Sequence, residues 1–262
     1  MDVLEGGLRV RLSEDQWRGL AGAVELPADA WGVLAPLNTP GDDVPDEKYD
    51  GALISATRLA LGAGLVHLDV TTMAKERGLV ASLGSDGESA AGAARVLVAS
   101  DGGTGPAAPV PGVEVSAVYA DGLVGEVMRL VPPEVPLQPP AAPDSVTLRQ
   151  ELALVIAKAV RDDDDRLARE VASQCGWSEV PDVLISLAHE VRANVTSVLR
   201  VEGSPSVVVR RWLQCDLGWV SLAIAGGQVT HTLCSRQEIA ADLVYALTGA
   251  FEFALTGAEH HG

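Results

Sequence analysis

Short runs of alternating apolar and polar residues are interspersed with amphipathic stretches along the whole chain. The first example is "LRVRL", which predicts a strand, followed by "SEDQWRGLAGAV", which predicts a helix. Ser13 and Gln16 have the spacing of a capping box at the start of that helix. Further helices are expected at about 51–62 and 69–79, and strands at 93–100 and 113–120. The pattern therefore predicts an α+β fold.

Two segments have almost the same pattern and suggest an internal repeat. Residues 113–131 read "VEVSAVYADGLVGEVMRLV", and residues 218–234 read "GWVSLAIAGGQVTHTLC". Asp121-Gly122 in the first and Gly226-Gly227 in the second are dipeptides that favour a two-residue hairpin turn. We expect two equivalent hairpins, in two similar α+β halves related by a pseudo-two-fold axis.

The second half of the chain carries the clearest helix signals. Thr147 and Gln150 form another capping-box pair, followed by an apolar stripe at Leu148, Leu152, Val155 and Ile156. A second helix is expected after a cap at Asp164 or Asp165, and a third in "PDVLISLAHEVRANV". After strands in 197–234, Ser235 and Glu238 open a closing helix.

A proline-rich segment, "VPPEVPLQPPAAPDS" at 131–145, separates the halves. Its six prolines remove backbone donors and fix φ, so the segment is a semi-rigid connector. The expected organisation is an N-terminal α+β half at 1–133, a connector at 134–145 and a C-terminal α+β half at 146–262.

Composition and charge narrow the classes of partner. The net charge of −17 disfavours nucleic acid and anionic membrane surfaces, which would repel the chain. No stretch approaches the 18 consecutive apolar residues of a membrane span, and no secretion signal opens the sequence. Three scattered cysteines fit a reduced compartment. We expect a cytoplasmic protein without membrane insertion.

Residue types that could support catalysis are present but poorly placed. Asp216, His231 and Ser235 are the types of a nucleophilic triad, yet Ser235 is better explained as a helix cap. Cys215, His231 and Cys234 lack a fourth zinc ligand. The aspartates at 162–165 lack the spacing of a calcium loop, and no phosphate-binding glycine motif occurs. We expect no enzyme activity, no cofactor and no metal.

The glycine- and proline-rich stretch "DGGTGPAAPVPG" at 101–112 is the best candidate for a binding loop. Ordinary hairpin loops have two to five residues, so this connection between strands is unusually long. It is either a disordered insertion or a protein-binding loop on a rigid sheet. The candidate partner-binding residues are Asp101, Gly103, Pro106, Pro109, Val110 and Pro111, together with Trp212, since tryptophan is enriched at binding hot spots.

The order of elements resembles the EspG family of actinobacterial type VII (ESX) secretion chaperones. The resemblance rests on "ERGLV" at 76–80, the proline-rich midpoint, the "RRWL…GWVSLAIAGGQVTHTL" region and the closing "SRQEIAADLVYAL". It implies a cytosolic specificity chaperone that binds helical secreted proteins of the PE/PPE kind. The matching binding elements would be loop 101–112 and parts of 181–195 and 235–255. The strongly acidic charge departs from the family pattern.

Two other functions stay open at this point. One is a small-molecule sensor or enzyme of unrecognised type, which would need an enclosed pocket lined by polar groups with shifted pKa values. The other is a structural protein that self-assembles through exposed sheet edges. The sequence is compatible with a monomer or a homodimer.

Overall fold

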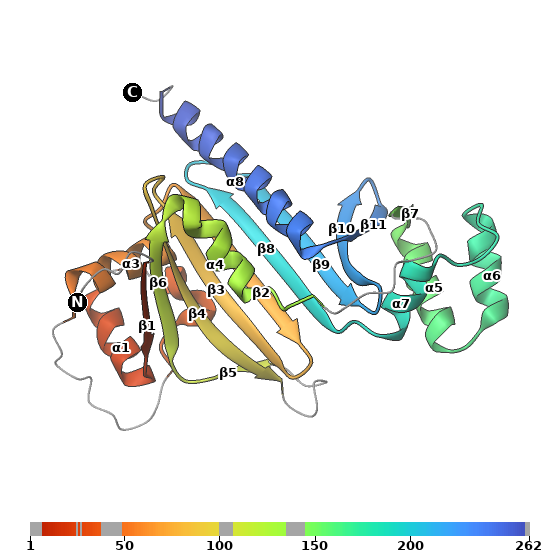
Figure 1. Ribbon diagram of the computed structural model, residues 1–262, viewed down its shortest axis with the longest axis horizontal. Coiled ribbons are helices and arrows are strands. Elements are labelled where there is room, and N and C mark those ends of the chain that lie inside the picture. Colours follow the sequence, from red (N-terminus) through yellow and green to blue (C-terminus); the bar gives the residue numbers. More distant parts are fainter. Residues whose placement is uncertain are drawn as a thin grey trace. The chain divides into compact units, whose positions relative to one another are not determined.

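The computed structural model describes residues 7–24, 26, 28–37, 49–99, 107–134 and 145–259 (Figure 1). The chain divides into two compact units. Unit 1 comprises residues 1–131, 197–209 and 242–262, and unit 2 comprises residues 132–196 and 210–241. Strands β8 (Ala193–Val201) and β9 (Val207–Cys215) and helix α8 (Arg236–Glu259) each contribute residues to both units.

Unit 1 contains all the helices and strands before residue 131. Its helical elements are α1 (Glu14–Ala23), α2 (Ala28–Trp31), η1 (Gly32–Leu34), α3 (Gly51–Leu61), η3 (Ala120–Gly122) and α4 (Leu123–Leu130). Its strands are β1 (Leu8–Leu12), β2 (Val66–Ala74), β3 (Arg77–Ser85), β4 (Ser89–Ala99), β5 (Ala107–Pro109) and β6 (Val113–Tyr119).

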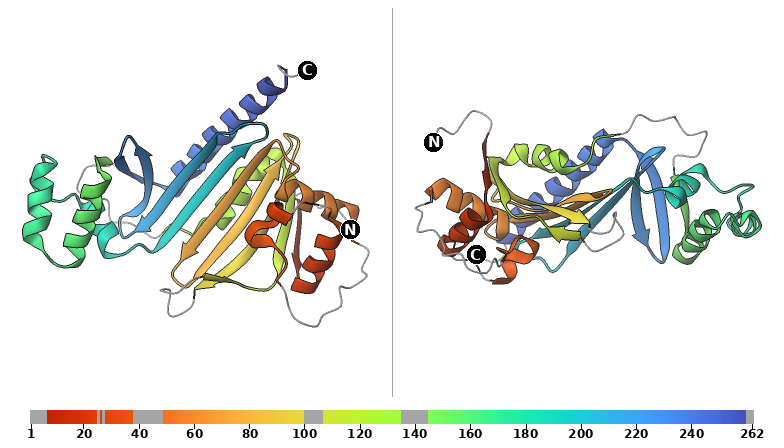
Figure 2. Two further views of the ribbon diagram at one scale, coloured as in Figure 1. Left: turned by 180° about the vertical axis from the view of Figure 1, so that it is seen from behind. Right: turned by 90° about the horizontal axis from the view of Figure 1, so that it is seen from below.

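The sheet of unit 1 has the strand order β1-β6-β4-β3-β2, followed by the unit 1 parts of β8 and β9, while β5 pairs with β4. The pairings within β1–β6 are antiparallel. Helices α1 and α3 cover one face of this sheet and α4 lies on the other (Figure 2). The α+β class expected from the sequence is confirmed.

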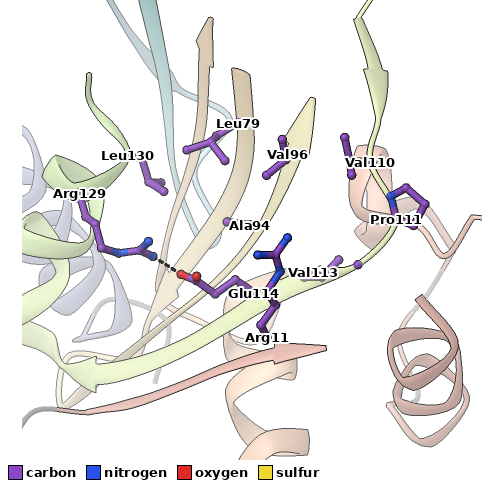
Figure 3. Close-up of a pocket in the computed structure, with 11 residues that line it drawn as sticks. Arg11, Leu79, Ala94, Val96, Val110, Pro111, Val113, Glu114, Arg129 and Leu130 are labelled. Carbon is purple, nitrogen blue, oxygen red and sulfur yellow. Dashed lines mark ion pairs between the residues drawn. The ribbon is translucent and has the colours of Figure 1, made fainter. Parts of the chain in front are cut away.

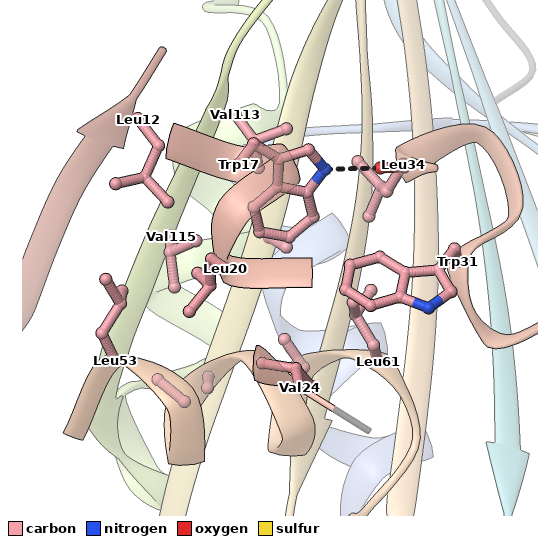
Figure 4. Close-up of a cluster of buried hydrophobic side chains, with 14 residues drawn as sticks. Leu12, Trp17, Leu20, Val24, Trp31, Leu34, Leu53, Leu61, Val113 and Val115 are labelled. Atoms are coloured by element: carbon pink, nitrogen blue, oxygen red, sulfur yellow. Dashed lines mark hydrogen bonds between the residues drawn. The ribbon is translucent and has the colours of Figure 1, made fainter. Parts of the chain in front are cut away.

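The main core of unit 1 lies between the sheet and the helices α1 and α3 (Figure 4). Trp17 and Trp31 meet edge to face with ring centroids 5.4 Å apart. The indole N–H of Trp17 donates to the carbonyl oxygen of Leu34 at 2.7 Å, so its one polar atom is satisfied inside the core. This contact fixes the η1 segment against α1.

Unit 2 combines a smaller sheet with three helices. Its own elements are β7 (Ser145–Arg149), α5 (Gln150–Arg161), α6 (Asp165–Gln174), α7 (Asp182–His189), β10 (Gly218–Ala225) and β11 (Gln228–Cys234). The strand order runs from the unit 2 parts of β8 and β9 through β10 and β11 to β7. Apolar side chains of α5–α7 pack with those of β7, β10 and β11 in one cluster.

The hairpin expected at Gly226-Gly227 is confirmed. Strands β10 and β11 pair antiparallel up to Ala225 and Gln228. The two glycines have φ of +57° and +77°, the left-handed values that a two-residue turn of this type needs. The capping box at Ser13 and Gln16 is also formed, with both reciprocal hydrogen bonds.

The hairpin expected at 113–131 is wrong. Residues 113–119 form β6, but 120–122 form η3 and 123–130 form α4. Gly122 has φ −77°, so the Asp121-Gly122 pair begins a helix instead of reversing the chain. Burial on one helical face stabilises α4, where Leu123, Val127 and Leu130 are buried. The two segments are therefore not equivalent hairpins, and a two-fold relation of the halves stays a prediction.

Two further expectations are wrong because a short apolar pattern was assigned to a helix and the structure has a strand there. Residues 69–79 are not a helix: β2 and β3 pair across a tight turn, with Ala74 opposite Arg77. Leu68, Val70 and Thr72 are buried at alternate positions. Likewise Thr147 is not a helix cap, because β7 extends to Arg149 and α5 begins at Gln150.

The helix caps at Asp164 and Ser235 are present as expected. The Asp164 carboxylate accepts from the Leu167 N–H, and Ser235 exchanges hydrogen bonds with Glu238. Among the described residues, one helix is long and apolar enough to cross a membrane by length and composition, namely residues 236–256 of α8. The core helix of a soluble protein can meet the same criteria.

A candidate protein-binding site beside residues 110–112

A small pocket lies beside the described end of the predicted binding loop, on the α4 face of the unit 1 sheet (Figure 3). Its volume is about 100 Å³. Apolar side chains from β3, β4, α4 and the segment after β5 line it: Leu79, Ala94, Val96, Leu130 and Val110. Arg11, Glu114 and Arg129 supply its polar groups. The pocket therefore combines an apolar floor with a charged rim.

Residues 110–112 are held against the sheet by their main chain. The Val110 N–H donates to the Val96 carbonyl at 2.8 Å, and the Gly112 N–H donates to Glu14 Oε2 at 2.7 Å. Gly112 has φ +96°, and a Cβ there would lie 2.8 Å from the Leu12 carbonyl oxygen. Only glycine fits this position without strain.

A buried ion pair between Arg95 and Glu14 supports residues 110–112. The Arg95 side chain is fully buried and contacts both carboxylate oxygens of Glu14 at 3.1 Å. Arg95 also donates to the Ala35 carbonyl, and Glu14 accepts from the Leu37 N–H at 2.6 Å. Burial lowers the pKa of Arg95, whereas the charge of Glu14 opposes that change. The pair thus ties α1, β4, residues 35–37 and Gly112 together.

The rim of the pocket carries a network of ion pairs from β1, β6 and α4. Glu114 pairs with Arg129 at 2.7 Å and with Arg9 at 3.6 Å, while Glu126 contacts the same two arginines. Arg11 lies on the same side of β1 as Arg9, two residues further on, and its guanidinium points toward the pocket (Figure 3). No ion pair joins Arg11 to another of the residues that the structure describes.

The structure separates the residues predicted for partner binding. Asp101, Gly103 and Pro106 lie outside the described residues. Pro109 ends β5, which pairs with β4, and Val110 and Pro111 line the pocket. Trp212 is 2% exposed in β9, so its indole is part of the interior and does not reach the surface.

Two of the three candidate triad residues have other partners. Asp216 forms an ion pair with Arg192, and the Ser235 hydroxyl contacts Glu238. His231 is buried, its Nδ1 has no hydrogen-bond partner among the described residues, and burial lowers its pKa. No group of three potential metal ligands occurs within the part of the chain that the structure describes.

A second, larger pocket of about 550 Å³ lies on the opposite face of the unit 1 sheet. Trp31, Val33 and Leu34 form an apolar side, and Asp69 and Arg200 form an ion pair across β2 and β8. His67 also lines this pocket, and its pKa is lowered by burial, an effect that the hydrogen bond with Gly64 partly offsets.

Sequence patterns missed Arg11 and Glu14 as site residues. The alternation in "LRVRL" places Arg9 and Arg11 on one face of an edge strand, a signal that was available. Glu14 has the pattern of an ordinary acidic residue in a first helical turn. Its contacts with Arg95 and Gly112 join positions 81 and 98 residues away, which local pattern cannot reveal.

Comparison with known proteins gives a structural likeness without sequence support. No protein-family model matches the chain, and no curated protein matches it. A solved structure of the type VII secretion system chaperone EspG5 of Mycobacterium tuberculosis, in complex with a PE25–PPE41 dimer, is similar. The match has a TM-score of 0.57 and 11% identity, and covers 89% of this chain and 94% of that chain. At this identity the likeness establishes a shared fold.

Proposed function

We propose that this protein is a chaperone that binds helical protein substrates of a type VII secretion system. The observation that carries the proposal is the fold likeness to EspG5, a chaperone seen bound to a PE–PPE dimer, over 89% of this chain. The finer parts of the proposal are PE/PPE-like substrates, an ESX-type pathway in an actinobacterium, and action in the cytoplasm.

The geometry of unit 1 is compatible with that function. Masking an apolar part of a helical protein requires an apolar recess on a stable surface. Residues 110–112 provide such a surface, because hydrogen bonds from Val110 and Gly112 fix their main chain while Val110 and Pro111 line a recess. Preorganisation of this kind lowers the entropic cost of binding.

Site-specific photocrosslinking tests the proposal. A photoreactive amino acid replaces Val110, and the protein is expressed in its native organism before illumination. We expect crosslinks to a helical protein exported by a type VII system, identified by mass spectrometry.

The matched control carries the photoreactive residue at Glu88, an exposed position in the turn that precedes β4. Crosslinks at Val110 that do not exceed those at Glu88, or that join only unrelated abundant proteins, contradict the proposal.

The second pocket supports an alternative, the binding of a small molecule. Its volume of about 550 Å³ falls in the range of small-molecule sites, and it combines Trp31 with His67 and an ion pair. A thermal-shift screen of metabolites tests this function. A compound whose stabilisation is lost on Trp31→Ala would favour it, whereas a screen without stabilising compounds would count against it.

A further inference from the structure

The rim of the pocket at residues 110–112 has more positive than negative groups. Arg9 and Arg129 are paired with Glu114 and Glu126, whereas Arg11 is exposed and has no ion-pair partner among the residues the structure describes. The chain as a whole has 36 acidic and 19 basic residues. An unpaired guanidinium beside an apolar recess is therefore opposite in sign to the protein's overall charge.

The floor of the pocket suits a branched aliphatic group. Leu79, Ala94, Val96 and Val110 line it, and its volume is about 100 Å³. For comparison, an apolar cavity of roughly 150 Å³ accommodates benzene. Burial of one aliphatic side chain here would remove apolar surface of both partners from water.

We propose that this pocket recognises an aliphatic side chain with a carboxylate beside it, presented on one face of a partner helix. The aliphatic group occupies the recess and the carboxylate pairs with Arg11. Leu and Glu three or four residues apart on a helix have this arrangement. The inference rests on the proposed function, since it names the chemistry of the helical partner.

Charge complementarity favours this occupant over the alternatives. A basic partner would be attracted by the net charge of −17 but repelled locally by Arg11. A second copy of this chain would bring the same arginines to the interface. The rim carboxylates of Glu114 and Glu126 are paired with Arg9 and Arg129, so a partner carboxylate would supply the counter-ion that Arg11 lacks among the described residues. A guanidinium can bind a carboxylate through two hydrogen bonds.

Two helical peptides of equal length test the inference. Both are alanine-based and 20 residues long, one with a Leu–Glu pair at i and i+4 and the other with Lys in place of Glu. The methyl NMR signals of Leu79, Val96 and Val110 in the full-length protein report binding. We expect the Leu–Glu peptide to bind at least tenfold more tightly than the Leu–Lys peptide, despite the protein's acidic charge. The affinity of the Leu–Glu peptide should fall as the salt concentration is raised.

Substitutions separate Arg11 from general charge effects. Arg11→Gln should abolish the preference for the Leu–Glu peptide, whereas Arg77→Gln, at an exposed arginine of the same unit, should retain it. Titration with two small molecules repeats the comparison of acidic and basic ligands without dependence on peptide helicity. 4-Methylpentanoate is the aliphatic anion and 3-methylbutylammonium is the aliphatic cation. The anion should shift the same methyl signals in the wild-type protein and fail to do so in Arg11→Gln.

Several outcomes would overturn the inference. These are equal or tighter binding of the Leu–Lys peptide, a preference that survives Arg11→Gln, or methyl signals that none of the ligands shifts. Shifts that depend on protein concentration alone would assign the pocket to a second copy. Crosslinking from Val110 to a secreted helical protein, combined with any of these results, would refute the acid-recognition inference and leave the proposed function standing. Binding of the anion without crosslinks to a secreted helical protein would count against the proposed function and would support recognition of a carboxylate by Arg11.

Discussion

Residues 113–130 of unit 1 and 218–234 of unit 2 begin with similar alternating patterns but form different structures. The first forms a strand, a 3-10 turn and a helix, and the second forms a hairpin. Both contain a Gly where a hairpin turn was predicted, yet Gly122 has φ −77° and Gly227 has φ +77°. The turn dipeptide alone does not decide the fold, because the residues that follow it determine which surface is buried.

The two units also differ in how they treat buried polar groups. Unit 1 encloses a charged pair, Arg95 and Glu14, whose hydrogen bonds reach the residues that shape the candidate site. The Gln214 amide of unit 2 is buried as well, but it is neutral and donates to the Pro133 carbonyl. Loss of one member of a buried ion pair is expected to cost more than loss of a neutral hydrogen bond.

The largest expected effect tests this difference between the two units. Arg95→Met leaves the Glu14 carboxylate buried without its cation and should lower the free energy of unfolding by about 3–5 kcal/mol. Gln214→Met should cost only about 0.5–1.5 kcal/mol. Urea denaturation of both variants measures the contrast. The double variant Glu14→Gln/Arg95→Met should recover part of the loss, and equal costs for the two single variants would contradict the comparison.

An intermediate effect separates the two glycines at the predicted turns. Gly227→Ala places a Cβ on a left-handed residue and should cost about 1–2 kcal/mol, although no other atom obstructs the side chain. Gly122→Ala keeps a right-handed backbone and should change stability by less than about 0.5 kcal/mol. Its Cβ would lie 3.2 Å from Val118, which must shift slightly. Equal Tm changes in the two variants would show that the segments do not differ at this point.

The smallest effect concerns one histidine in each unit. Burial lowers the pKa of both His67 and His231 below 6.5, so the unfolded chain binds more protons at mildly acid pH. The two buried, neutral imidazoles contribute fully to the free energy of unfolding above pH 6.5, and this contribution is lost as the pH falls below 6.5. Tm measured from pH 7.5 to 5 should fall less steeply in His67→Gln and in His231→Gln. A slope unchanged in both variants would show that these groups do not titrate in the folded protein.

Strong local signals predicted much of the fold. Ser13, Asp164 and Ser235 begin helices as their capping patterns indicate, and Gly226-Gly227 makes the expected turn. The failures occur where a short apolar run fits both periods. Leu68 and Val70 are buried in a strand, and Val127 and Leu130 in a helix, because sheet pairing and tertiary packing override local preference.

The candidate site was predictable only in part. The unusual composition of 101–112 directed attention to Val110 and Pro111, which line the pocket. The Val96 carbonyl that accepts from Val110 lies in β4, and the carboxylate that binds Gly112 is 98 residues away in the sequence. Sequence alone could not distinguish the exposed Arg11 from the paired Arg9, since their difference depends on where α4 places Glu126.

The way in which residues 110–112 are attached has an evolutionary consequence. Hydrogen bonds from backbone N–H groups fix the segment, so the side chains at 110 and 111 take no part in those bonds. Selection could therefore exchange these two side chains to suit a different binding partner while the path of the backbone stayed the same. Gly112 and Glu14 would then be the constrained positions, and diversity at 110 and 111 would follow the chemistry of the bound partner.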